Sequence, residues 1–261
     1  KNNKPDYIIH LAGYIGGIGA SVNEPVNFLY FNMMMGMNLV KIAHEQNIKN
    51  FLNIGSSCIY PINFKSSISE DKLLDGKLEI TNEGYALAKI SIIKLCEYIS
   101  KQSKLNYFSL IPCNIYGPYD KFDIAKGHVI GSLINKISYA KNADKNFVEL
   151  WGSGKIKREF LYVDDVSRAI IKFLNNKKLI NKGIYWLNIG SGYDLSINSL
   201  AQKIAAIFGY QGKFINNLKK PDGIKRKLLD ISIGKNFNWK PKYTLEEGLK
   251  KTIEWYKNSK S

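Results

Sequence analysis

The stretch "IIHLAGYIGGIGAS", Ile8 to Ser21, begins an α/β pattern: a strand-like apolar run leads into Gly13, Gly16 and Gly19. Glycines at this spacing after a strand are typical of the loop that holds the pyrophosphate of a dinucleotide. Such a loop is followed about 20 residues later by an acidic residue for the ribose, or by an arginine for a 2′-phosphate. That region here reads "FNMMMGMN", residues 31–38, and contains no charge. We therefore interpret the glycines as residues that line a pocket without gripping a pyrophosphate.

Strand-like apolar runs alternate with longer helical patterns along the chain, which predicts βαβ units around a parallel sheet. The expected strands are "YIIHLA", "NFLNIGSS", "YFSLIP", "FVELW", "REFLYV" and "GIYWLNIGSG", and the expected helices cover residues 24–46, 83–102, 129–141, 164–175, 196–209 and 245–257. We predict a doubly wound parallel sheet in residues 1–120. A smaller α+β lobe should occupy residues 121–261, with residues 160–195 returning to the sheet.

The 261 residues carry a formal net charge of +16, yet the lysines are scattered among Asn and Ile. A chain-wide compositional bias explains this pattern, so we expect no nucleic-acid binding. No apolar run approaches the roughly 20 residues that cross a bilayer, so we expect no membrane association. Cys58, Cys96 and Cys113 contain no C-x-x-C pair. We expect no metal site, a reducing cytoplasmic location, and core positions for Cys96 and Cys113.

Tyr85 and Lys89 in "NEGYALAK" are a candidate catalytic pair. Their spacing puts both side chains on one helix face, one turn apart. A lysine ammonium stabilises a nearby tyrosinate and lowers the pKa of the phenol, which can then exchange a proton with a carbonyl or an alcohol. The same spacing also fits an ordinary pair on a helix surface, so the motif needs a context.

That context comes from polar residues at the ends of predicted strands. Ser56 and Ser57 in "LNIGSSCIYP" end one strand, and Asn114 in "IPCNIYGP" ends the next. Ligands of open α/β sheets bind at the carboxyl ends of the strands. A serine hydroxyl there can hydrogen-bond the same carbonyl that Tyr85 addresses, which favours an active site at this edge.

With these motifs the chain resembles the extended short-chain dehydrogenase/reductases and, among them, the GDP-L-fucose synthases. The resemblance runs from near residue 5 to near residue 255, and its motifs are "GSSCIYP", "TNEGYALAK", "NIYGPYDKFD", "GHVI", "WGSGKIKREFLYVDD" and "KPDGIKRKLLD". It implies a Rossmann-like NAD(P)-binding domain that carries the catalytic residues, followed by a lobe that binds substrate. It also implies an NADPH-dependent enzyme of nucleotide-sugar biosynthesis. That enzyme would epimerise GDP-4-keto-6-deoxy-D-mannose at C3 and C5 and reduce its C4 keto group, giving GDP-L-fucose.

The resemblance assigns roles to individual residues. Tyr85 would protonate the C4 oxygen, with Lys89 lowering the pKa of the phenol and holding the nicotinamide ribose, while Ser56 orients the keto group. Cys58 corresponds to the base of the epimerisation and His128 to its acid partner, and a thiol and an imidazole on opposite faces of a sugar suit such proton exchange. The positions implied to contact NADP(H) are Ile54, Gly55, Ser56, Ser57, Lys89, Pro112, Cys113, Asn114, Ile115 and His128. Those implied to hold the GDP-sugar are Lys136, Trp151, Arg158 and Asp222.

Taken without the resemblance, these residues have plainer interpretations. A small Cys near a strand end usually packs in the core, and Arg158 beside Glu159 would usually be a solvated pair. The motifs in register favour function instead. The Arg158 guanidinium suits a pyrophosphate because it forks to two oxygens, and Trp151 offers a flat apolar face to the substrate.

By the same resemblance, "HLAGYIGGIGAS" corresponds to a later strand and its substrate-side loop, where glycines let the backbone approach ligands. The pyrophosphate loop, its helix and the cofactor-selecting strand would then lie in roughly 50–60 residues upstream. The sequence starts with Lys rather than Met. We expect it to be N-terminally incomplete, with its first βαβ unit missing, and we expect the fragment alone to bind NADP(H) poorly and to lack activity.

Four departures from the family pattern leave alternatives open: Tyr14 stands where Lys is usual, Gly84 where Pro is usual, and Gly127 and Gly131 where Ser and Pro are usual. A C4 reductase of a GDP-6-deoxy-4-keto-heptose, without epimerisation, fits these changes. An NAD-dependent nucleotide-sugar 4-epimerase and an inactive binding scaffold are further alternatives. A 4,6-dehydratase is disfavoured because it would carry Thr-Asp-Glu at residues 56–58. The resemblance also implies a homodimer formed by the helices that begin at Glu24 and Glu83.

Overall fold

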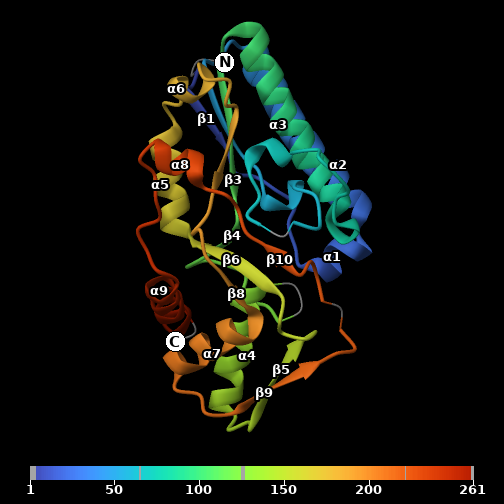
Figure 1. Ribbon diagram of the computed structural model, residues 1–261, viewed down its shortest axis with the longest axis vertical. Helices are drawn as coiled ribbons and strands as arrows, with labels where there is room; N and C mark the ends of the chain where they lie inside the picture. Colours follow the sequence, from blue (N-terminus) through green and yellow to red (C-terminus); the bar gives the residue numbers. More distant parts are fainter. Residues whose placement is uncertain (1–3, 65, 125–126, 221, 260–261) are drawn as a thin grey trace.

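The computed structural model describes residues 4–64, 66–124, 127–220 and 222–259 (Figure 1). Its central element is a four-stranded sheet in the order β1 (Tyr7–His10), β2 (Asn50–Ile54), β3 (Asn106–Pro112) and β7 (Trp186–Ile189). All three pairings are parallel, so the carboxyl ends of these strands lie at the same edge. The predicted α/β class with a parallel sheet is confirmed.

Helices cover both faces of this sheet (Figure 1). The long helices α2 (Pro25–Glu45) and α3 (Glu83–Ser103) pack together over one face, and α5 (Val163–Phe173), α6 (Lys177–Ile180) and α8 (Ser232–Asn236) lie over the other. α2 begins with Pro25 at its first position, where the missing N–H costs nothing. The short α1 (Ile18–Asn23) precedes it, and the 3₁₀ turns Ser57–Ile59, Glu70–Lys72 and Ile80–Asn82 lie between β2 and α3. Within the described ranges, no helix combines the length and apolarity needed to cross a membrane.

The other half of the chain carries two small sheets. β6 (Lys157–Tyr162) pairs in parallel with β4 (Asn114–Tyr116) and β10 (Arg226–Lys227), and antiparallel with β8 (Asp194–Ser196). β5 (Phe147–Trp151) and β9 (Lys213–Asn217) form a parallel pair beside α4 (Val129–Asn142) and α7 (Ile197–Phe208), and α9 (Leu245–Asn258) packs against α7 on the side away from this pair. Sequence analysis did not predict β4, β8, β9 or β10. β4, β8 and β10 are too short to show the alternating pattern of a strand. β9 reads "KFINN", which is largely polar.

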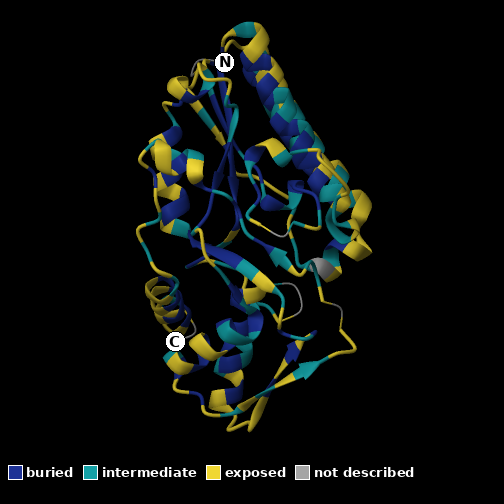
Figure 2. Cartoon of the chain, in the orientation of Figure 1, coloured by how far each residue is buried: buried dark blue, intermediate teal, exposed yellow. Residues whose placement is uncertain are grey.

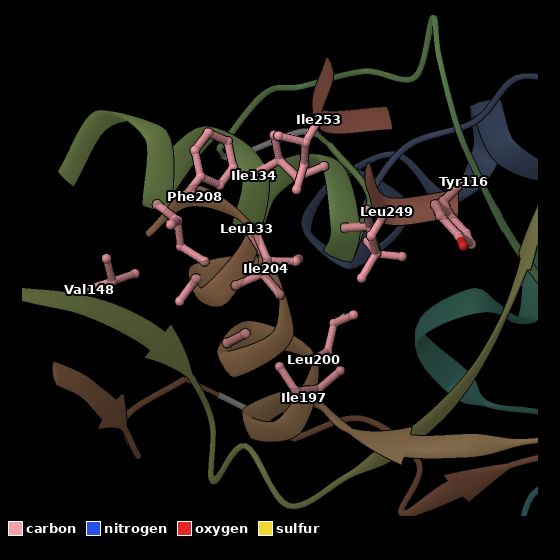
Figure 3. Packing of buried hydrophobic residues seen from close by; sticks show 14 of the residues in the cluster. Tyr116, Leu133, Ile134, Val148, Ile197, Leu200, Ile204, Phe208, Leu249 and Ile253 are labelled. Carbon is pink, nitrogen blue, oxygen red and sulfur yellow. The ribbon is translucent and has the colours of Figure 1, made fainter. Parts of the chain in front are cut away.

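Buried apolar side chains gather in separate clusters, and the sheet strands are largely buried (Figure 2). One cluster joins β3 and β7 to α5, and a second packs α2 and α3 on the sheet. A third fills the lobe between α4, α7 and α9, with Leu133, Ile204 and Leu249 at its centre (Figure 3). Tyr116 of β4 already belongs to this third cluster. The predicted domain boundary near residue 121 stays a prediction.

The two ends of α7 follow from single residues. The Ser196 hydroxyl accepts a hydrogen bond from the Ser199 N–H at 3.1 Å, which caps the first turn. Gly209 ends the helix with φ +67°, a left-handed conformation that glycine adopts without strain. The predicted stop at Gly209 is thereby confirmed.

Candidate active site

The carboxyl ends of β2 and β3 bring together the residues predicted to contact the cofactor. The Gly55 N–H donates to the Leu110 carbonyl at 2.8 Å, so the pairing of β2 with β3 continues past Ile54. The Cys113 N–H donates in turn to the Ile189 carbonyl of β7 at 3.1 Å. Residues 54–57 and 112–115 therefore lie at one edge of the sheet, with Asn114 exposed and Cys113 buried.

Ser56, Tyr85 and Lys89 meet at this edge. The Ser56 hydroxyl accepts the Cys58 N–H at 3.2 Å, which fixes the turn after β2, and it also hydrogen-bonds with the phenol of Tyr85. The Lys89 ammonium lies 5.8 Å from the centre of the Tyr85 ring and donates to the Ile54 carbonyl at 2.9 Å. The three side chains that the motifs singled out converge, although they come from two elements separated by a loop.

The protonation of Tyr85 differs from the sequence-based expectation, in which Lys89 lowers the pKa of the phenol. Burial raises the pKa of Tyr85 well above its ordinary value, the nearby Cys58 raises it further, and the hydrogen bond with Ser56 acts in the opposite direction. Burial also lowers the pKa of Lys89, from 10.5 to about 8. Desolvation is the largest cause of both shifts, and the Tyr85 phenol stays protonated at neutral pH.

The glycine stretch lies against this cluster. A Cβ added to Gly13 would stand 4.0 Å from the Lys89 ammonium, so the backbone after β1 lies beside Lys89. His10, the last residue of β1, is buried nearby, and its pKa falls to about 4 through burial and the charge of Lys89. His10 is therefore a neutral imidazole at physiological pH. This arrangement supports our interpretation that the glycines line the pocket.

Cys58 faces two cations. The Lys227 ammonium donates to the Cys58 sulfur at 3.8 Å and lies 3.9 Å from a carboxylate oxygen of Glu79. Arg158 also lies within electrostatic reach of Cys58 and Glu79, and burial lowers the pKa of its guanidinium. Lys227 is 8% exposed, so its charge acts in a poorly solvated place. Positive charge beside a thiol favours the thiolate, and beside a phosphate it favours binding.

Glu159 holds the strands that carry these cations. Its side chain is fully buried and accepts the N–H groups of Gly192 at 2.7 Å and Leu229 at 2.9 Å. Its main-chain carbonyl accepts the Asn114 side chain at 2.8 Å. Burial raises the pKa of Glu159 to about 7. The alternative of a solvated Arg158–Glu159 pair is wrong, because the two side chains of a strand point to opposite faces and only Arg158 reaches solvent.

Trp151, Lys136 and Asp222 lie together in the lobe. Trp151 is 47% exposed, with the Lys136 and Lys220 ammonium groups 5.2 and 5.1 Å from its ring centre. Asp222 accepts the N–H of Ser153, two residues after Trp151, at 2.9 Å, and its charge also reaches Arg158. The four predicted substrate contacts thus form a continuous set from Arg158 to the indole.

His128 lies at the start of α4. It is the exposed N-cap residue of α4, and its charge acts on Asp120. Among the described residues, no hydrogen bond joins His128 to Cys58. A Cβ on Gly127 would come within 2.4 Å of the carbonyls of Lys121 and Asp123, and one on Gly131 within 2.7 Å of the Lys121 carbonyl. These two departures from the family pattern let the loop 121–123 close onto the start of α4.

Sequence reasoning missed Lys227 and Glu79. Both lie within or beside quoted motifs, "KPDGIKRKLLD" and "TNEGYALAK", but Lys227 is one of 38 basic residues and nothing local sets it apart. Its burial follows from the pairing of β10 with β6, where Lys227 stands opposite Arg158. No local signal in the sequence identifies that pairing.

Burial of Lys89 predicts a stability that depends on pH. Because its folded-state pKa of about 8 lies below the ordinary 10.5, the unfolded chain binds more protons between these values and stability rises with pH across that window. Below pH 8 the charged buried group costs about 3 kcal/mol. Lys89→Met also leaves the Ile54 carbonyl unpaired, at about 1 kcal/mol. We expect the variant to be about 2 kcal/mol more stable at pH 7, with the difference vanishing near pH 10.

Urea unfolding of both proteins at pH 7 and pH 10 measures this difference. The exposed Lys41→Met on α2 serves as the control and should change the free energy of unfolding little at either pH. A Lys89→Met difference that stays constant between the two pH values would show that Lys89 is not a desolvated cation.

Comparison with known proteins identifies the family to which this chain belongs. The sequence model of the NAD dependent epimerase/dehydratase family matches residues 1–190. This chain belongs to the NAD dependent epimerase/dehydratase family. Membership in the epimerase/dehydratase family indicates a nicotinamide cofactor, and it confirms the predicted enzyme class.

Individual members of the epimerase/dehydratase family match nearly the whole chain. The GDP-L-colitose synthase of Yersinia pseudotuberculosis is 46% identical over 262 aligned residues, which cover 100% of this chain and 84% of that protein. The GDP-L-fucose synthase of Escherichia coli K12 is 39% identical, covering 96% of this chain and 80% of that protein. Among solved structures, a GDP-mannoheptose C4 reductase from Campylobacter jejuni with NADP bound has a TM-score of 0.86 at 30% identity, covering 97% and 83% of the two chains. The predicted resemblance to GDP-sugar epimerase/reductases is confirmed.

Proposed function

We propose that this protein is an NADPH-dependent epimerase/reductase that converts GDP-4-keto-6-deoxy-D-mannose to GDP-L-fucose. The observation that carries the proposal is the meeting of Ser56, Tyr85 and Lys89 at the carboxyl edge of the sheet, with Cys58 facing the buried Lys227 and the half-buried Arg158. The first group of residues suits reduction of a ketone, and the thiol suits proton exchange at the neighbouring carbons. Relatives named GDP-L-fucose synthase support the same activity.

The residues at this edge fit a nicotinamide dinucleotide. Lys89 is 5% exposed, and one of its three N–H donors bonds to the Ile54 carbonyl. The other donors are left for the hydroxyls of a ribose. Gly55 has no room for a side chain, because a Cβ there would come within 2.6 Å of Ile111, so the backbone at this position stays close to the strand end. When bound, NADPH supplies the hydride that reduces C4. The choice of NADP over NAD rests on the solved relative that holds NADP.

Tyr85 serves as the acid of the reduction. Its raised pKa keeps the phenol protonated at neutral pH, which is the state that can give a proton to the C4 oxygen as that oxygen gains negative charge. Ser56 donates a hydrogen bond to the same oxygen and orients the ketone. The proton lost by Tyr85 returns from solvent after the product alcohol leaves.

Cys58 and His128 serve the epimerisation. A carbon next to the C4 ketone is acidic, so a thiolate at Cys58 can remove its proton, with the electron pair moving into an enolate. His128 returns a proton to the opposite face of the ring, and the keto group is restored. Lys227 and Arg158 lie beside the thiol and bring positive charge to this part of the site.

Arg158, Lys136 and Trp151 hold the GDP portion. The guanidinium and the ammonium offer positive charge to the diphosphate, and the exposed indole offers a flat face to the nucleoside. Asp222 ties the segment before β10 to the loop after β5, which keeps the two ends of this subsite at a fixed separation.

Incubation of the protein, expressed from its complete open reading frame, with GDP-4-keto-6-deoxy-D-mannose and NADPH tests the proposal. We expect NADPH oxidation, followed by absorbance, and GDP-L-fucose as the product identified by NMR. Parallel reactions with NADH and with a GDP-6-deoxy-4-keto-heptose measure the preference for cofactor and sugar. Absence of NADPH oxidation with the hexose would overturn the proposal, and turnover of the heptose alone would favour the reductase without epimerisation.

GDP-L-colitose is a second candidate product. The relative with that name is more similar to this chain than the E. coli GDP-L-fucose synthase, at 46% against 39% identity. The same active-site groups serve either sugar. The protein is incubated with the precursor of GDP-L-fucose and, separately, with the precursor of GDP-L-colitose. NMR of the GDP-sugar formed in each reaction distinguishes the two activities.

We further propose that the protein is a homodimer through α2 and α3, located in the cytoplasm. Val26, Tyr30 and Met34 follow one another at intervals of four residues on α2 and are exposed, so they form one apolar stripe along the outer side of the helix. A second copy of this chain presents the same stripe and would cover it. Three free cysteines fit a reducing compartment.

Tyr30→Glu tests the dimer. A carboxylate at the centre of a self-complementary apolar contact appears twice across a two-fold axis and would be buried without a partner. We expect the wild type to sediment as a dimer at micromolar concentration and Tyr30→Glu as a monomer. Val129→Glu changes an exposed apolar residue of α4, away from this stripe, and should leave the dimer intact. A wild-type monomer would refute the assignment.

A further inference from the structure

The side chain of Asn32 forms hydrogen bonds with Tyr14, which lies outside its own helix. Asn32 is 2% exposed on α2. Its oxygen accepts the N–H of Tyr14 at 2.9 Å, and its amide nitrogen donates to the Tyr14 carbonyl at 2.9 Å and to the Phe28 carbonyl at 2.7 Å. Both backbone groups of Tyr14 are therefore held by one buried carboxamide, as a neighbouring strand would hold them. Only the bond to Phe28 lies within α2.

The segment held in this way lies against Lys89. A Cβ added to Gly13 would stand 3.4 Å from the Asn32 side-chain oxygen and 4.0 Å from the Lys89 ammonium. The backbone at Gly13 therefore lies close to both side chains. A shift of this segment would either crowd the Lys89 ammonium or leave it without its neighbour.

The same segment reaches Tyr85 through aromatic rings. The Tyr14 ring meets Phe28 edge-on at 5.1 Å between ring centres, and Phe28 meets Tyr85 edge-on at 6.5 Å. Gly84 permits this approach, because a Cβ there would stand 3.0 Å from the Pro25 carbonyl of α2. The N-terminal half of α2 thus touches both Tyr85 and the segment that borders Lys89.

We propose that Asn32 is a positioning residue of the active site: it holds Gly13 and Tyr14 against Lys89 and, through the Tyr14 and Phe28 rings, sets the place of Tyr85. The inference rests on the proposed function only in assigning the reduction to Tyr85 and Lys89. Asn32 itself touches no reacting atom. Its effect should appear in the chemical step rather than in the binding of the GDP-sugar, whose contacts lie in the lobe.

Asn32→Leu removes all three hydrogen bonds at nearly constant volume. Because small displacements of catalytic groups cost as much as about a hundredfold in rate, we expect kcat for NADPH oxidation to fall at least about tenfold. The KM for the GDP-sugar should stay within about twofold. Asn38 is exposed on the same helix, and Asn38→Leu is the matched control with kcat unchanged. A kcat for Asn32→Leu within about twofold of the wild type, in protein shown to be folded by circular dichroism, would overturn the inference.

Asn32→Asp supplies a readout that a purely structural role would not move. The carboxylate keeps the shape of the side chain, loses both amide donors and puts a negative charge near Lys89, which favours the charged ammonium. The stability gain that wild-type Lys89 shows between pH 8 and 10.5 should therefore begin at a higher pH and be smaller in this variant, because the pKa of Lys89 in the unfolded chain is unchanged. Unfolding followed across this range measures the shift without any substrate. An unmoved profile would show that Asn32 does not act on Lys89, whereas a wild type without activity would refute the proposed function alone.

Discussion

Tyr85→Phe is expected to lower kcat for NADPH-dependent reduction by about 10²- to 10⁴-fold, the range that general acid catalysis contributes. The change removes a single oxygen and leaves the ring contact with Phe28. Because burial keeps the Tyr85 phenol protonated, the group removed is the proton donor itself. The variant no longer has a polar hydroxyl to bury, so its free energy of unfolding should be at least as large as that of the wild type. Stopped-flow measurement of NADPH oxidation at saturating substrate gives the chemical rate.

Tyr98→Phe is the matched control for this prediction. Tyr98 lies on the same helix, is 56% exposed and contacts the Lys94 ammonium through its ring. Removing its hydroxyl should leave kcat unchanged. If Tyr85→Phe retained more than about a tenth of the wild-type rate, another group would have to donate the proton, and the role of Tyr85 would be refuted.

Most of the fold follows from local signals that the sequence states directly. α2, α3 and α4 begin and end within two residues of the predicted limits, because apolar periodicity and residues such as Pro25 mark them. The meeting of Ser56 with Tyr85 follows from a general rule, since the carboxyl ends of parallel strands share one edge. The short strands β8 and β10 are different. They exist because β6 offers them partners, and neither carries a pattern of its own.

The electrostatics of the site could not be predicted from spacing alone. The Tyr85–Lys89 motif suggests that the lysine lowers the pKa of the phenol, whereas burial of both groups raises one pKa and lowers the other. Burial depends on α2, the glycine segment and the strand ends packing around the pair, so it is a property of the tertiary structure. The same holds for Glu159, which the sequence places in an ordinary charged pair and the fold places among backbone N–H groups.

The corrected protonation states give the two halves of the proposed reaction different requirements. Reduction needs an acid, which the buried Tyr85 phenol provides because burial keeps it protonated. Epimerisation needs a base, and Cys58 lies beside Lys227 and within reach of Arg158. The proposed acid, Tyr85, and the proposed base, Cys58, lie on either side of Ser56. The Ser56 hydroxyl hydrogen-bonds with the Tyr85 phenol and also accepts the Cys58 N–H. The two activities should therefore be separable by mutation.

Cys58→Ser is expected to separate them. A serine hydroxyl is far harder to ionise than a thiol, so proton removal from the carbons beside the ketone should slow by about 10²- to 10⁴-fold. Reduction at C4 does not use the thiol and should stay within about tenfold of the wild type. Run in D₂O, the wild-type reaction should place deuterium at the epimerised carbons. The variant should yield a reduced GDP-sugar that keeps hydrogen and the original configuration there, as read by NMR.

The ratio of deuterium incorporation to NADPH oxidation makes this comparison independent of how much protein is folded. Cys96→Ser replaces a thiol buried in the core; it should lower stability and leave the ratio unchanged. A Cys58→Ser enzyme that still incorporates deuterium at the wild-type ratio would remove Cys58 from the mechanism. A wild type that reduces its substrate without incorporating any deuterium would instead identify a C4 reductase, since Tyr85, Ser56 and Lys89 suffice for that reaction while the cations around Cys58 would then serve only the diphosphate.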